Sequence, residues 1–173
     1  MADSKETVDL FHLVGTVVAA SQIFEIVFVL AARLALKQAN IQSLEELEPL
    51  TKSKSFKRPV KALLKELSKA QSIDAGLDVR VSKLVEKRHR VLHRSFLEFG
   101  WPIAMAPEKD AEFRMLCVQV GVESQAMSVV FIDLLLTWMK RFPATSATAI
   151  AHEAEFKDLA VRIRSQSEAI STA

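Results

Sequence analysis

Cysteine, glycine and tyrosine are scarce in this sequence. Its 173 residues include one cysteine, four glycines and no tyrosine. A lone cysteine excludes an intramolecular disulfide, and the shortage of glycine and aromatic β-formers argues against a sheet with many tight turns. Hydrophobic residues make up 50% of the chain, which is enough for one buried core without a crosslink or a metal. The composition therefore favours a single helical domain.

An excess of charge of one sign is also missing. The chain has 23 Lys and Arg residues against 21 Asp and Glu residues, a formal net charge of +2. This balance does not by itself point to a nucleic acid or an anionic membrane as partner. The basic residues nevertheless concentrate between Lys52 and Arg94, where they form either a local basic groove or an ordinary solvated face. Those that precede the fourth helix are Lys52, Lys54, Lys57, Arg58, Lys61, Lys65 and Lys69.

One apolar stretch, residues 10–36, is long enough to be weighed as a membrane span. Polar side chains interrupt it, and a carboxylate such as Glu25 in mid-span is costly in lipid. We therefore interpret the stretch as a core helix. The acidic first nine residues are unlike the basic start of a secretory signal. Cys117 lies in an apolar run and is expected to be buried and unreactive. These features favour a cytoplasmic protein without a membrane partner.

Hydrophobic periodicity and chain breakers predict an up-down bundle of five to six helices. The expected helices cover residues 4–38, 43–50, 59–71, 77–99 and 107–142, with a last polar helix ending near residue 166. Ser43–Glu46 has the spacing of a capping box. Residues 1–166 form one domain, and the tail 167–173 is expected to fray. In the long helix the expected core residues are Leu116, Val120, Met127, Val130, Phe131, Leu134, Leu135 and Trp138.

The helix over residues 77–99 carries one residue out of place. At 100° per residue, Arg88 lies in the middle of an apolar stripe formed by Val81, Leu84, Val85, Leu92, Phe96 and Phe99. A guanidinium in that position must be paired or face a cleft, because an unpaired buried charge is costly. Glu25 of the first helix is a candidate structural partner, and a phosphate is the alternative ligand. The opposite, solvated arc holds Lys83, Glu86, Lys87, Arg90, Arg94 and Glu98.

Two histidines, His89 and His93, are four residues apart and therefore lie on one side of this helix. Imidazoles move protons near neutral pH, so the pair and Arg88 form a candidate site for phosphate chemistry. The His-x-x-x-His spacing also occurs in zinc sites. The glutamate of the metalloprotease motif is missing, however, and His152-Glu153 is the only distant source of a third ligand. We therefore expect neither a metal nor a cofactor.

The segment Arg88-His89-Arg90-Val91-Leu92-His93 resembles the Arg-polar-x-x-x-His signature of HEPN-domain proteins. Its surroundings are similar to a bacterial branch of that family, with Leu84 before the motif and His93-Arg94-Ser95-Phe96 closing it. The turn Ser43-Leu44-Glu45-Glu46-Leu47 and the pair Phe24-Glu25 add support. The resemblance covers about the first 140 residues. One departure is His89, which replaces the usual asparagine.

The resemblance implies a HEPN-like homodimer in which two motifs share one cleft, and a metal-independent ribonuclease, as a toxin or defence component. It assigns proton transfer to His93, phosphate binding to Arg88 and substrate contact to His89; Lys87 and Arg94 are the candidate cations for substrate binding. RNA and a second copy are then the partners. The resemblance also implies a cognate antitoxin or a nucleotidyltransferase as a further partner. Many family members are not nucleases, so a non-catalytic interaction module with Arg88 in a structural ion pair is the alternative.

Overall fold

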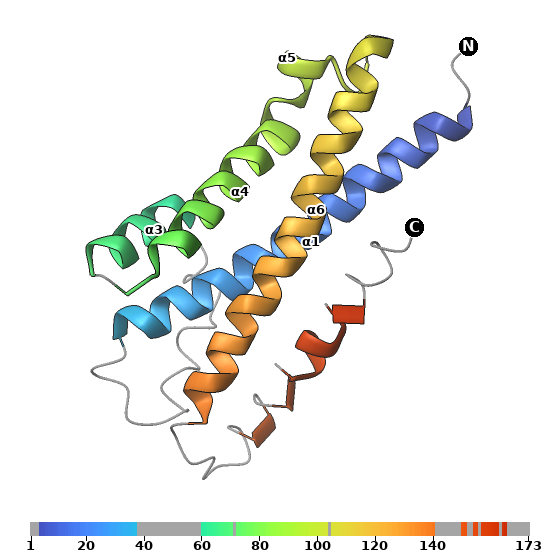
Figure 1. Ribbon diagram of the computed structural model, residues 1–173. Helices are drawn as coiled ribbons and strands as arrows, with labels where there is room; N and C mark the ends of the chain where they lie inside the picture. The colour runs from blue at the N-terminus through green and yellow to red at the C-terminus, as the bar shows by residue number, and fades with distance from the viewer. Residues whose placement is uncertain are drawn as a thin grey trace.

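Helices make up nearly all of the chain that the structure describes. The computed structural model describes residues 4–37, 60–70, 72–103, 105–140, 150–151, 154–155, 157–162 and 164–165. No strand occurs in these ranges, so the all-α prediction is confirmed. The helices, coloured along the chain in Figure 1, are α1 (Ser4–Lys37), α3 (Val60–Lys69), α4 (Ala75–His93), α5 (Ser95–Phe99) and α6 (Pro107–Met139).

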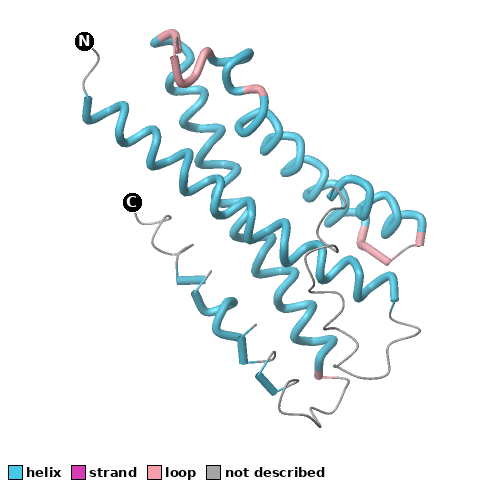
Figure 2. The backbone as a smooth tube through the Cα atoms, turned by 180° about the vertical axis from the view of Figure 1, so that it is seen from behind, coloured by secondary structure: helices cyan, strands magenta, loops and turns pink. Residues whose placement is uncertain are grey.

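The centre of the bundle is the contact between α1 and α6, which cross each other in Figures 1 and 2. Phe24 and Phe28 of α1 are buried against Phe131 of α6, and the rings of Phe28 and Phe131 meet edge to face with centroids 5.1 Å apart. The hydroxyls of Ser21 and Ser124 are 3.5 Å apart inside this contact. A helix that is apolar on most sides suits such a central position, as the sequence of α1 indicated.

The helix α3 covers one end of the bundle, and its loop leads into α4. The stripe of Val60, Leu63, Leu64 and Leu67 is buried, as its spacing predicted. The carboxylate of Asp74 then accepts hydrogen bonds from the backbone N–H groups of Gly76, at 2.8 Å, and Leu77, at 3.1 Å. This N-cap starts α4 at Ala75, two residues earlier than the periodicity indicated.

The single helix expected over residues 77–99 is wrong, because the chain bends at Arg94. This residue has φ −119° and ψ 3°, which ends α4 at His93 and starts α5 at Ser95. Gly100 ends α5 in turn with a φ of 76°, a conformation that favours glycine. The bend turns Phe96 away from the core, and this side chain is 58% exposed. Val91 lies before the bend, about 60° around α4 from Arg88, so it belongs to the buried stripe although the expected stripe omitted it.

Most expected core residues of α6 are buried. Leu134 is the correction, because it is 50% exposed and borders an open cavity. Val130 is only half-buried. Cys117 is buried, as expected, and this burial raises the pKa of its thiol to about 12, which disfavours the reactive thiolate. The expected core residues that are buried are Leu116, Val120, Met127, Phe131, Leu135 and Trp138.

The C-terminal segments that are described are helical and pack beside α6. Ala160 is buried in the core, and Arg164 forms an ion pair with Asp133 of α6 at 2.8 Å. Other predictions concern residues outside the described part: the helix over 43–50 with its capping box, the connector over 52–57, the break at 143–146, the His152-Glu153 pair and the tail 167–173.

Candidate functional site

Arg88 is joined to Glu25 across the contact between α4 and α1. The Nη2 atom of Arg88 lies 2.7 Å from Oε2 of Glu25. The two side chains are 20% and 30% exposed, so the pair sits at the edge of the core and not inside it. The Nε–H of Arg88 is buried and has no hydrogen-bond partner among the described residues. A guanidinium has five N–H donors, so Glu25 leaves most of them available.

The sequence of α4 explains why Arg88 points towards α1. Val81, Leu84 and Val85 precede it on the same stripe and are buried, and Val91 follows it. A residue at this helical position must face the core unless the helix rotates, and rotation would expose those aliphatic side chains. Glu25 meets it from α1, one residue after the buried Phe24. Each charged residue is thus placed by the burial of its neighbours.

His89 and His93 stack on each other along the exposed side of α4. Their ring centroids are 5.2 Å apart with an interplanar angle of 42°, and both side chains are exposed. They lie about 100° and 140° around the helix from Arg88. Within one chain, therefore, the histidines face solvent while Arg88 faces α1.

Lys87 and Arg94 lie on a different flank of α4 from the histidines. Lys87 is about 200° around the helix from His89, and its Nζ donates to Oε1 of Gln119 in α6 at 2.9 Å. The amide is neutral, so this hydrogen bond does not compensate the charge of Lys87. Arg94 forms an ion pair with Glu98, its Nε lying 3.2 Å from Oε1. A single chain does not gather all of the candidate residues on one face.

Arg90 is not simply part of the solvated face, which corrects its expected role. Its Nε lies 2.6 Å from Oε2 of Glu98, its Nη2 lies 3.6 Å from Glu112, and its guanidinium sits over the ring of Phe99. The bend at Arg94 changes the direction of the chain so that Glu98 and Phe99 of α5 reach Arg90.

Glu98 is the centre of this ion-pair cluster, and sequence reasoning missed it. The hydrogen bond from Arg90 lowers the pKa of the Glu98 carboxyl, and the charges of Arg90, Arg94 and His89 act in the same direction. The same bond raises the pKa of Arg90. The four-residue spacing of Arg94 and Glu98 could have indicated their ion pair from the sequence. The contact of Arg90 with Glu98 could not be predicted in this way, because it depends on the bend.

The basic residues of α3 lie far from the histidines. Lys61, Lys65 and Lys69 are on the exposed face of α3, which packs near the start of α4 in Figure 1. The hydroxyl of Ser68 contacts Asp78 there at 3.0 Å. From that turn of α4 to His93 the helix rises by about 22 Å. Lys52, Lys54, Lys57 and Arg58 are outside the described residues.

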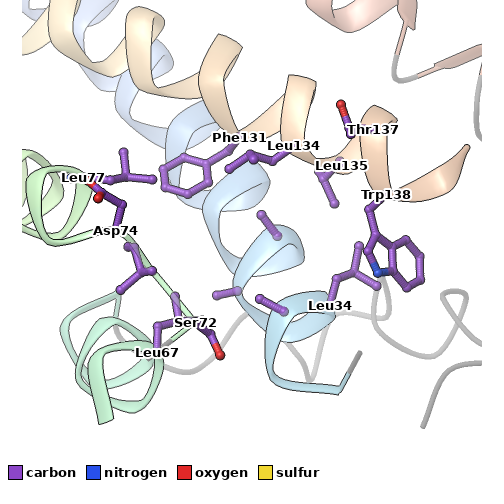
Figure 3. A pocket seen from close by; sticks show the side chains of 14 residues that line it. Leu34, Leu67, Ser72, Asp74, Leu77, Phe131, Leu134, Leu135, Thr137 and Trp138 are labelled. Carbon is purple, nitrogen blue, oxygen red and sulfur yellow. Dashed lines mark hydrogen bonds between the residues drawn. The ribbon is translucent and has the colours of Figure 1, made fainter. Parts of the chain in front are cut away.

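No group of three or more metal-ligating side chains comes together in the described part of the chain. An open cavity of about 490 Å³ does exist, but it lies between α1, the turn before α4 and the end of α6 (Figure 3). Its walls are mostly aliphatic and aromatic, and its carboxylate, Asp74, already caps α4. None of the candidate residues lines this cavity. The chemistry-bearing groups, and not this cavity, therefore define the candidate site.

Two helices, Asp9–Leu36 within α1 and Pro107–Met139, are long and apolar enough to span a bilayer by length and composition. Roughly half of the most apolar window of each is buried inside the bundle. Their polar residues also find partners there, Glu25 with Arg88 and Ser21 with Ser124. A long helix that is apolar on most sides can be either the core helix of a folded domain or a membrane span.

No protein-family model, curated protein or solved structure matches this chain. The side chains of the site themselves indicate what chemistry it can perform. A partly accessible guanidinium can bind and stabilise an anion, and exposed imidazoles can accept or donate a proton near neutral pH. One chain supplies these functions on two adjacent faces of α4.

Proposed function

We propose that this protein is a HEPN-like, dimeric, metal-independent ribonuclease of the cytoplasm, acting as a toxin or defence component. The observation that carries the proposal is the arrangement on α4. Arg88 is anchored by Glu25 yet keeps a fifth of its side chain exposed, and two exposed histidines follow it within five residues. Acid–base cleavage of RNA needs these two kinds of group, a fixed cation for the phosphate and an accessible imidazole for the proton.

The ion pair with Glu25 supports a catalytic role for Arg88. Glu25 holds the guanidinium by one nitrogen, which limits its rotation and leaves further N–H donors for two phosphate oxygens. A group positioned before substrate arrives reorganises little in the transition state. In this scheme Glu25 is a positioning residue.

The separation of the faces supports a dimer. Because Arg88 and His93 are about 140° apart around α4, a substrate held by one guanidinium is poorly placed for the imidazole of the same chain. A second copy related by a two-fold axis can bring its own histidines over the same phosphate. The exposed apolar side chains of Met115, Val118 and Val122 on α6 provide surface for such an interface.

The reaction would follow the chemistry of metal-free RNA cleavage. One imidazole takes the proton of the ribose 2′-hydroxyl, and the 2′-oxygen attacks the phosphorus atom. The bond to the 5′-oxygen breaks, and a second, protonated imidazole gives that oxygen its proton. Arg88 neutralises the additional negative charge on the phosphate. The products are a 2′,3′-cyclic phosphate and a free 5′-hydroxyl.

The test is cleavage of single-stranded RNA by purified protein in EDTA, with identification of the 2′,3′-cyclic ends. The change His93→Ala should lower the rate by about 10²–10⁴-fold, the usual contribution of a general acid or base. His93 is exposed, so this change should leave the circular dichroism spectrum and the melting temperature unaltered. The matched control is His12→Ala, which removes another exposed histidine, on α1. Equal rates for wild type and both His93→Ala and Arg88→Ala would refute the proposal.

A non-catalytic interaction module is the second candidate, and the ion pair itself favours it. Glu25 compensates the charge of Arg88 inside one chain, so the arginine has a structural role even without a substrate. The partner would be an antitoxin, a nucleotidyltransferase or another protein. In that case wild type shows no RNA turnover, and Arg88→Ala lowers the melting temperature without any change in activity.

A further inference from the structure

The pair of stacked imidazoles on α4 offers chemistry that RNA cleavage alone does not use. We propose that His89 and His93 bind one divalent transition-metal ion, of the Cu²⁺, Ni²⁺ or Zn²⁺ class, between their rings, and that this ion inhibits the enzyme. Binding stands on the geometry of the two histidines. Inhibition rests in addition on the proposed ribonuclease function.

The distance between the rings suits a shared ion. Two imidazoles that bind one ion at about 2.1 Å, in a roughly tetrahedral arrangement, have ring centres about 5.2 Å apart. The centroids of His89 and His93 are 5.2 Å apart in the structure. The spacing of the two rings therefore suits a shared ion once rotation about the side-chain bonds turns one nitrogen of each ring towards it, with no change in α4.

The helix holds this spacing in place. His93 is the last residue of α4, and the backbone N–H of Arg94 closes that turn with a 3.2 Å hydrogen bond to the carbonyl oxygen of Arg90. In the described part of the chain neither imidazole makes a hydrogen bond, so their nitrogen lone pairs are available. Both side chains are exposed, so water can complete the coordination shell.

The surrounding charges permit a cation here. Arg90 and Arg94 are close in sequence, but both are paired with Glu98, whose carboxylate lies near enough to His89 for the imidazole to influence its pKa. Glu86 is exposed one turn before His89 on the same face of α4 and adds negative charge. With two protein ligands and the remainder water, the site resembles neither a four-ligand structural zinc nor a three-ligand catalytic one. It would hold an exchangeable ion.

The consequence for the proposed reaction is inhibition. A metal bound to His93 occupies the nitrogen lone pair that has to accept the 2′-hydroxyl proton. The ion therefore competes with the proton transfer, and a chelator restores it. This makes the metal a regulator of the site and not a cofactor of the reaction.

Calorimetric titration of the EDTA-treated and desalted chain with Ni²⁺, Cu²⁺ and Zn²⁺ tests the binding. We expect one ion per chain, with Cu²⁺ bound more tightly than Ni²⁺. Loss of an outer-shell partner typically weakens metal sites by about 10–100-fold, so His89→Ala and His93→Ala should each weaken binding at least tenfold. The controls His12→Ala and His152→Ala should bind as wild type does. Unchanged affinity in the His89→Ala/His93→Ala double variant, or an equal loss in either control, overturns the site.

An activity assay separates this proposal from the function on which it partly rests. Wild type should cleave RNA in EDTA, lose that activity in Zn²⁺ at a concentration that saturates the calorimetric site, and regain it with excess EDTA. Saturated binding without inhibition overturns the regulatory part. Metal binding by a chain that never cleaves RNA refutes the ribonuclease and supports the histidine site alone.

Discussion

The contact between α1 and α6 differs in kind from the attachment of α4. The first is built from buried aromatic and aliphatic side chains such as Phe24, Phe28 and Phe131, with Ser21 and Ser124 as its polar contact. On α4, a buried stripe is flanked by charged pairs to three other helices. They are Arg80 with Glu123, Arg88 with Glu25, and Arg90 with Glu98.

The two kinds of contact contribute differently to the stability and the geometry of the fold. Burying an aromatic or large aliphatic side chain stabilises a fold by about 1.5–3 kcal/mol, whereas an exposed ion pair contributes about 0–1 kcal/mol. The contact of α1 with α6 therefore supplies free energy of folding. The rotation of α4, and with it the direction of Arg88 and the histidines, follows from the burial of its aliphatic stripe. The charged pairs add the hydrogen-bond distances that join α4 to its neighbours.

The largest expected effect comes from breaking the apolar contact. The change Phe131→Ala should lower the free energy of unfolding by about 3–5 kcal/mol, through lost burial and the cavity that remains. Urea denaturation followed by circular dichroism measures it. The control is Val79→Ala, on α4 and 51% exposed, which should cost less than about 0.5 kcal/mol. Similar losses in both variants would contradict the assignment of α6's buried face.

A smaller effect is expected from the pair between α1 and α4. The change Glu25→Ala leaves a mostly buried guanidinium without its partner and should cost about 1–3 kcal/mol, between the ranges for exposed and for fully buried pairs. Urea denaturation again measures it. The double change Glu25→Leu/Arg88→Leu removes both charges and should recover most of this loss. If the double variant is less stable than Glu25→Ala, then Glu25 and Arg88 stabilise the fold by more than the compensation of each other's charge.

The smallest effect concerns the cluster at the end of α4. Because folding lowers the pKa of Glu98, its contribution to stability is present above the ordinary value of 4.5 and is lost as the pH falls towards the lowered pKa. Wild type should thus melt at a slightly higher temperature than Glu98→Gln at pH 7. The difference should shrink steadily below about pH 4.5. A constant difference from pH 7 to pH 3 would argue against an ionised Glu98 in the cluster.

The sequence was most informative where a local pattern alone decides the structure. The buried stripe of α3, the extent of α1 and the burial of Cys117 follow from the spacing of apolar residues. Arg88 could be picked out because a helical wheel requires only a continuous helix. Its pairing with Glu25 was one of two options that the sequence left open, since neither segment tells how closely α1 and α4 approach each other. The resemblance to HEPN proteins stays a prediction.

What the sequence could not provide was the direction of the chain after His93. A bend at one residue, Arg94, brings Glu98 and Phe99 over Arg90 and leaves Phe96 exposed. The spacing of residues predicts which face of a helix they share only while the helix continues, so it misplaced Phe96 beyond the bend, although Phe99 is buried as expected. Leu134 was misplaced for a different reason: α6 is continuous there, and the exposure of this side chain depends on which neighbours cover that part of the helix.

By itself the sequence determined an all-helical fold, a central apolar α1 and an arginine on the inner stripe of α4, because periodic burial of apolar side chains acts along the chain. Only the tertiary structure decided which carboxylate meets Arg88, that the stacked histidines face solvent, and that Arg90 is held by Glu98. These depend on the distance and orientation between helices, which packing of the whole core sets at once.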